Sequence, residues 1–174
     1  QSYSSTASLK FAQVSDAHFY TGANNTTYKM VGESPKLLDD VIEQINETPN
    51  VSFVMFTGDQ IDKPFEKELS AFLPHTEKLN VPWYFAFGNH DTMYGGYLTP
   101  RVYMDLVNNY NKNYKFEKSY YSFVPQKGYK AIVLDTIIRD RLTANGKLGD
   151  EQLQWLDNEL ANSKKDTVLI FMHV

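Results

Sequence analysis

The sequence predicts an α/β fold in which helices and strands form separate layers. Three short apolar runs, at residues 9–14, 51–56 and 81–87, each lead directly into a polar segment. Continuous apolar runs of this length are typical of strands covered on both faces in a parallel sheet. Helical periodicity occupies the stretches between the runs. The alternation of strand and helix therefore favours a parallel sheet with helices packed on it.

The first half of the chain contains two predicted helices. After the first strand, residues 15–33 are rich in Gly, Asn and Thr, have no regular period, and are predicted to form a loop. Ser34 is a suitable N-cap with Pro35 at the first helical position, and residues 37–45 repeat apolar side chains on one face. A second helix is predicted over residues 64–79, before the strand at 81–87.

The second half of the chain predicts a smaller set of mixed elements. A short helix begins at the pair Thr99-Pro100, and residues 119–124 and 129–134 flank a four-residue loop, which indicates an antiparallel hairpin. Residues 148–160 predict a helix with leucines along one face, and residues 167–172 predict a final strand. We expect the hairpin and this last strand to belong to a sheet.

Composition limits the class of protein. The chain has 174 residues with 42% hydrophobic content, so we expect a single domain over residues 1–174, with residues 1–8 flexible. The 17 basic and 21 acidic residues are interspersed, which makes duplex nucleic acid an unlikely partner. No apolar run approaches the roughly 20 residues of a transmembrane segment. The chain begins at Gln1 with a polar stretch, which suits a processed exported protein or a trimmed chain, and we favour export.

Polar motifs follow the predicted strands. Because the sequence contains no cysteine, any metal must be held by Asp, His, Asn or Glu. The motifs are Asp16-Ala17-His18, Gly58-Asp59-Gln60-Ile61-Asp62, Gly88-Asn89-His90-Asp91, and His173 after the last strand. The ends of strands meet at one edge of an α/β sheet, and carboxylate, imidazole and amide oxygen are suitable ligands for Mn, Fe or Zn. Two such ions about 3.5 to 4 Å apart can hold a bridging hydroxide and clamp a phosphate ester.

Each motif alone has a simpler explanation. An Asp after a strand often caps a turn, and a Gly-Asp pair supplies a positive φ angle followed by a helix cap. The Asn-His pair can be a plain turn. The conjunction of motifs favours a metal site, because all of them directly follow strands and three of the four histidines belong to them.

The order of these motifs resembles that of the calcineurin-like metallophosphoesterases. The similarity extends over nearly the whole chain and includes Leu134-Asp135-Thr136 and the segment 148–156. It implies a layered α-β-β-α sandwich and a metal-dependent phosphoester hydrolase that uses a metal-bridging hydroxide. Small phosphodiesters or nucleotides are the favoured substrates, and the cofactors would be two metal ions, Mn, Fe or Zn.

The resemblance also implies a set of metal ligands. Asp16 and His18 would bind the first metal, Asp59 would bridge both, and Asn89 and His173 would bind the second. This assignment uses every motif that follows a strand.

The same resemblance gives His90 a catalytic role. It would reach the phosphate and either stabilise the charged transition state or protonate the leaving group, with Asp91 holding its ring. Asp62 would stay outside the set of direct ligands.

Members of the family carry a further Gly-His-x-His motif downstream, and this sequence stops at Val174 before it. If these residues are all there is, the resemblance implies that each metal lacks one ligand and that the second sheet is incomplete. In that case we expect weak metal occupancy, exposed apolar surface and a tendency to associate through that surface.

Other functions remain open at this point. The same ligands serve phosphomonoesterases and protein phosphatases, and a non-catalytic metal-binding domain could keep the fold. The aromatic stretch 94–114 can stack on a base or simply pack on the sheet. A serine hydrolase is disfavoured because no Gly-x-Ser-x-Gly elbow is present.

Overall fold

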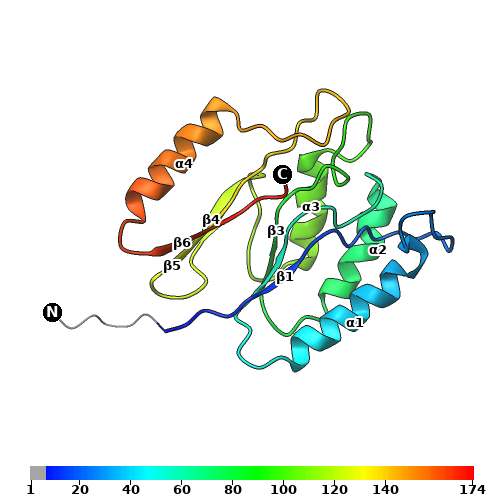
Figure 1. The fold of residues 1–174 in the computed structure, drawn as a ribbon, viewed down its shortest axis with the longest axis horizontal. Helices are drawn as coiled ribbons and strands as arrows, with labels where there is room; N and C mark the ends of the chain where they lie inside the picture. The colour runs from blue at the N-terminus through cyan, green and yellow to red at the C-terminus, as the bar shows by residue number, and fades with distance from the viewer. Residues whose placement is uncertain (1–6) are drawn as a thin grey trace.

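Figure 1 shows the computed structural model, which describes residues 7–174. The expected flexibility of residues 1–8 concerns a segment that lies mostly outside the described residues. The described elements, in chain order, are β1 (Ala12–Val14), the 3-10 helix η1 (Val31–Glu33), α1 (Ser34–Glu47), β2 (Val54–Phe56), α2 (Glu66–Thr76), β3 (Trp83–Phe85), α3 (Pro100–Tyr110), β4 (Tyr121–Phe123), β5 (Tyr129–Val133), α4 (Asp150–Asn162) and β6 (Thr167–Phe171).

The strands form two three-stranded sheets. The first has the order β1-β2-β3 and is parallel throughout, whereas in the second, β4-β5-β6, the pair β4-β5 is antiparallel and β5-β6 is parallel. Helices α1, α2 and α3 lie on the outer side of the first sheet, and α4 lies on the far side of the second (Figure 1). The arrangement is a layered α-β-β-α sandwich, as the sequence led us to expect.

Aromatic side chains fill the core on both faces of the first sheet. Between the sheets, the ring of Phe123 on β4 packs against Phe53 at 5.4 Å and stacks on Tyr84 at 3.6 Å between ring centroids. On the helix side, Phe56 meets Phe72 of α2 at 5.6 Å. Strand β2 is therefore buried on both faces, which explains its uninterrupted apolar sequence.

The predicted strands and the second predicted helix are present with shorter bounds, and the helix predicted at 148–160 is shifted to Asp150–Asn162. The strands at 9–14, 51–56 and 81–87 are confirmed in place, but each pairs over only three residues. Some flanking residues still bond across the strands, as where Phe53 O accepts the N–H of Ala12 at 3.0 Å, and their side chains add to the packing, as where Phe11 stacks on Phe53 with ring centroids 5.1 Å apart. The helix at Pro100 is confirmed, and its N-cap Thr99 accepts a hydrogen bond from the N–H of Val102.

One detail of the predicted helices is wrong. Ser34 does not cap α1 but lies inside it, because η1 precedes it; its hydroxyl donates to the carbonyl of Val31 and accepts from the N–H of Tyr20. On α4 the leucine face is not fully covered, since Leu153 and Leu160 remain 45% and 39% exposed. Among the described residues, no helix combines the length and apolarity needed to cross a membrane.

Candidate metal centre

Four polar motifs meet at the carboxyl edge of the first sheet. Asp16 and His18 follow β1, Asp59 follows β2, and His90 lies in the turn after β3. His173 arrives at the same place from β6 of the second sheet, and its Nδ1 lies 2.8 Å from the carbonyl of Thr57. Residues more than a hundred positions apart thus line one site.

The backbone of this site is held in an unusual conformation. The φ angles of Asp16, His18 and Asp59 are positive, at 54°, 43° and 53°. Residues other than glycine seldom adopt this region. The strain is balanced by pairing of the two loops: Asp16 N–H donates to Gly58 O at 3.1 Å and His18 N–H to Asp59 O at 2.9 Å. Strained residues of this kind concentrate at functional sites, where they aim side chains inward.

Gly58 allows the second sheet to approach this loop. Its φ is 101°, and a Cβ placed on it would lie 2.4 Å from Nδ1 of His173. A side chain at position 58 would therefore push His173 away from the site. From the sequence alone, Gly58 could also be a simple turn residue. In the structure it is a close contact between the two sheets.

Asp59 lies at the centre of the cluster and is 4% exposed. Its Oδ1 accepts the N–H of His90 at 2.8 Å. Its Oδ2 lies 3.6 Å from Nε2 of His18 and 3.5 Å from Nε2 of His173. One carboxylate oxygen therefore faces two imidazoles from opposite motifs, as a bridging ligand would.

The charges of the site are strongly coupled. Burial would raise the pKa of Asp59, but the contacts with His173 and with the N–H of His90 outweigh it, so this pKa lies below its ordinary value. The Asp59 carboxylate raises the pKa of His173 to about 9, against the effect of burial. Binding of a cation here must displace the proton of His173, which makes metal affinity dependent on pH.

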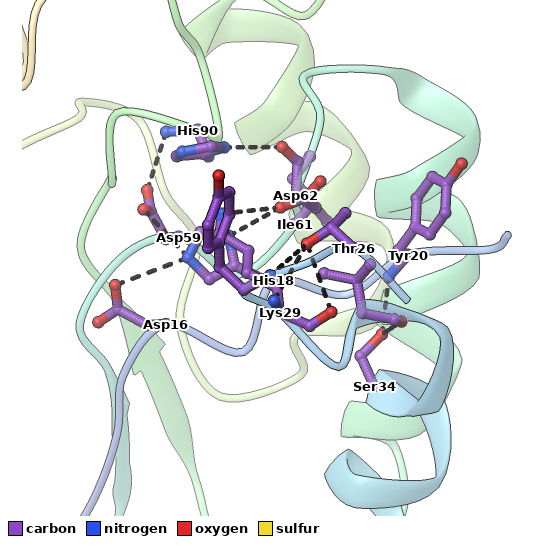
Figure 2. A network of polar contacts seen from close by, with 12 residues as sticks. Asp16, His18, Tyr20, Thr26, Lys29, Ser34, Asp59, Ile61, Asp62 and His90 are labelled. Atoms are coloured by element: carbon purple, nitrogen blue, oxygen red, sulfur yellow. Dashed lines mark hydrogen bonds and ion pairs between the residues drawn. The ribbon is translucent and has the colours of Figure 1, made fainter. Parts of the chain in front are cut away.

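Each histidine of the site has a partner for its Nδ1 atom. Nδ1 of His18 lies 3.1 Å from Oδ1 of Asp62, and Nδ1 of His90 lies 2.7 Å from the carbonyl of Asp62 (Figure 2). Nδ1 of His173 has the carbonyl of Thr57 as its acceptor. When Nδ1 carries the proton, the lone pair of Nε2 is free for a cation, which is the usual arrangement around metal-bound histidines.

The donor atoms form two groups that share Asp59. His18, Asp59 and His90 form one, and Asp16, Asp59 and His173 form the other; in each group the ligand atoms lie within 4.8 Å of one another. Carboxylate and imidazole suit Mn, Fe or Zn, so the residues fit a pair of such ions.

Asn89 and His90 are neighbouring predicted site residues in the turn after β3. Asn89 precedes His90 in the same turn and is half-buried, and both residues line one pocket. His90 belongs to the first donor group, although sequence reasoning placed it on the phosphate and not on a metal.

The expected contact between Asp91 and the ring of His90 is wrong. Asp91 is fully buried, and its carboxylate accepts the backbone N–H groups of Gly88 at 2.8 Å, Asp59 at 3.0 Å and Ile61 at 3.2 Å. A buried Asp side chain needs hydrogen-bond donors, and these three amides supply them, while Nδ1 of His90 has the carbonyl of Asp62 as its partner. Asp91 thus fixes the loops that present Asp59 and His90.

Lys29 is a site residue that sequence reasoning missed. Its Nζ lies 3.0 Å from Oδ1 of Asp62 and 3.2 Å from Nδ1 of His18 (Figure 2). Burial and the charge of Lys29 lower the pKa of His18. Lys29 comes from the long loop after β1, which had no periodicity or motif to single it out.

Comparison with known proteins gives a consistent result. Residues 9–174 match the family model described as calcineurin-like phosphoesterase. Among curated proteins, the chain is 26% identical over 171 residues to a probable glycerophosphodiester phosphodiesterase of Arcobacter nitrofigilis, with 92% of this chain and 55% of that protein covered. It is 25% identical over 193 residues to the human tartrate-resistant acid phosphatase type 5, with 97% of this chain and 56% of that protein covered.

A solved structure supports the fold. A dimetal phosphatase from Danio rerio superposes with a TM-score of 0.69 at 18% identity, over 95% of this chain and 69% of that one. The chain spans about half the length of these two curated relatives.

Proposed function

The chain belongs to the calcineurin-like phosphoesterase family, and from this premise we propose that it acts as a metal-dependent phosphoester hydrolase. Small phosphodiesters or nucleotides are the favoured substrates. The similarity to a probable phosphodiesterase supports the choice of a diester.

One observation carries the proposal. Oδ2 of Asp59 faces Nε2 of His18 at 3.6 Å and Nε2 of His173 at 3.5 Å, while the Nδ1 of each histidine is engaged elsewhere. In the metal-free protein the protonated His173 pairs with this carboxylate; once a cation displaces that proton, the Nε2 lone pairs of both histidines flank one buried carboxylate. The arrangement favours a bridging ligand between two cations.

For the remaining ligands we keep the assignment that the resemblance implies: Asp16 and His18 would hold the first metal, Asn89 and His173 the second, with Asp59 shared. The 3.8 Å between Nε2 of His18 and Oδ1 of Asp16 supports the first pair, although Asp16 also lies in the donor group of His173. Bound there, two ions of Mn, Fe or Zn would supply a water of lowered pKa and neutralise charge on the phosphate oxygens.

His90 would act on the phosphate from the edge of the site. Its ring is oriented by the carbonyl of Asp62 at 2.7 Å and its backbone by Oδ1 of Asp59. From this position it can stabilise negative charge on the phosphate or give a proton to the leaving oxygen. Asp91 contributes as a positioning residue, because it holds the backbone of Asp59 and Gly88 and does not touch the ring.

A phosphomonoesterase is the second candidate, and the acid phosphatase relatives favour it. An inactive metal-binding domain is the third. The three differ in what they hydrolyse, so one assay separates them.

The test measures hydrolysis of bis-p-nitrophenyl phosphate and p-nitrophenyl phosphate with added Mn²⁺, Fe²⁺ or Zn²⁺. We expect metal-dependent hydrolysis of the diester, and a loss of at least about a hundredfold in kcat for His90→Ala. The control is His75→Gln, which changes a histidine on α2 that pairs with Asp39 away from the cluster. Preference for the monoester would support the second candidate, and binding of metal without hydrolysis of either compound would support the third.

A further inference from the structure

A pocket with a volume of about 390 Å³ adjoins the candidate metal centre. Its walls are residues 62–65, which follow β2, and residues 93–97, which follow the turn after β3, with His90 on the side that faces the metal cluster. The volume lies within the range of pockets that hold small ligands.

The lining of this pocket is mainly apolar and aromatic. The rings of Phe65 and Tyr97 stack with centroids 5.9 Å apart and planes 24° from parallel. Tyr97 and Tyr94 are nevertheless 82% and 56% exposed. Tyrosines that only supplied core packing would be covered, whereas these two line the pocket and keep most of their surface exposed.

The wall formed by residues 93–97 is fixed in place before any ligand arrives. Gly96 N–H donates to Met93 O at 3.0 Å, and Leu98 N–H donates to Pro64 O at 3.2 Å, which ties the two walls together. A Cβ at Gly96 would lie 2.5 Å from Cγ of Pro64, so the loop packs directly on the proline. Leu98 anchors the end of the loop, with 2% of its surface exposed.

We propose that this pocket is the subsite for an aromatic ring carried by the group that is esterified to the phosphate. The ring could be the base of a nucleotide or the ring of a phenol. The inference deepens the proposed function and rests on it, because the phosphate must lie at the adjoining metal cluster. His90 lines both the pocket and the first donor group, so a phosphate held at that group would extend its substituent towards Tyr94 and Tyr97.

The chemistry of the walls decides between substituents. A small polyol would place hydroxyl groups against apolar surface without hydrogen-bond partners, at a cost in free energy. A flat ring can instead stack on Tyr97 and gain about 1–3 kcal/mol, or about 5- to 150-fold in affinity. The pocket therefore selects for a ring.

The test compares two unreactive probes, phenylphosphonate and methylphosphonate, which share the phosphonate and differ in the ring. Dissociation constants are measured by calorimetry in the Mn²⁺-loaded protein, and the hydrolysis of bis-p-nitrophenyl phosphate is followed in the same samples. We expect phenylphosphonate to bind about tenfold more tightly, Tyr97→Ala to remove most of this preference, and Tyr97→Phe to keep it. Val124→Ala, an exposed apolar residue after β4, is the matched control and should keep the preference.

The outcomes separate the inference from the function on which it rests. Equal binding of the two probes, or an unchanged preference in Tyr97→Ala, overturns the subsite even when the diester is hydrolysed. Failure of both probes to bind, together with absence of metal-dependent hydrolysis, overturns the subsite and the proposed function at once.

Discussion

The two sheets of this protein differ in how completely they are covered. Strand β2 of the first sheet is buried at every residue, between α1 to α3 and the second sheet. Strand β6 of the second sheet leaves Ile170 43% exposed, and Leu153 on the neighbouring α4 is 45% exposed. Asp16, His18 and Asp59, which have strained backbones, and the buried Asp91 follow strands of the first sheet. The second sheet also carries a buried carboxylate, Asp135 after β5, but no residue with a strained backbone follows its strands among the described residues.

The exposed side chains of the second sheet agree with the apolar surface that the resemblance implied. Three expectations stay predictions: association through this surface, export of the protein, and that duplex nucleic acid is not a partner.

The largest expected effect tests the rigidity of the first sheet. Asp91→Ala removes the acceptor for three buried N–H groups, so we expect the free energy of unfolding to fall by about 3 kcal/mol or more. Leu160→Ala on α4 is the comparison in the second sheet and should cost less than about 1 kcal/mol, because Leu160 is already 39% exposed. Urea-induced unfolding measures both. Equal losses in the two variants would contradict the contrast between the sheets.

A smaller effect concerns the residues behind the ligands. Asp62→Ala removes the carboxylate that contacts Nδ1 of His18 and Nζ of Lys29, so we expect Mn²⁺ affinity to fall by about 10- to 100-fold. Calorimetric titration measures the affinity. Asp157→Ala, an exposed carboxylate on α4, is the control. If Asp62→Ala binds Mn²⁺ as tightly as the unmodified protein, Asp62 does not orient His18.

The smallest effect is a pH dependence of the metal-free protein. The pKa of His173 is about 9 in the folded state and about 6.5 when unfolded, so its pair with Asp59 stabilises fully below about pH 6.5. This contribution is lost as the pH rises through about 9. We expect the melting temperature to fall over that window, and His173→Gln to flatten the fall. The same pH slope in both proteins would exclude His173 as its source.

Much of the fold could be predicted because local patterns and tertiary packing agree. Helix α3 follows from Thr99 and Pro100, and the buried strands follow from their apolar runs. The sequence could not predict that Ser34 lies within α1, because that depends on the preceding 3-10 turn and on Tyr20. The exposure of Leu160 likewise depends on what covers α4, which periodicity does not encode.

The candidate site, like the fold, could be predicted only in part. The motifs of Asp16, His18, Asp59 and His173 were identified because each follows a strand, and the structure brings these residues together. The partners of Asp91 could not be predicted, since they are backbone amides of other loops. The resemblance implied a side-chain contact between Asp91 and His90, but Asp91 is buried on the backbone amides instead.

The position of His173 also dictates an order of assembly. Its contact with Thr57 closes a loop of 116 residues, and its strand must first pair with β5. Closing so long a loop is entropically unfavourable until the intervening contacts exist. The donor group made by His18, Asp59 and His90 can therefore form before the last strand is in place, whereas the group of Asp16, Asp59 and His173 cannot. The second cation could therefore bind only after the last strand has folded.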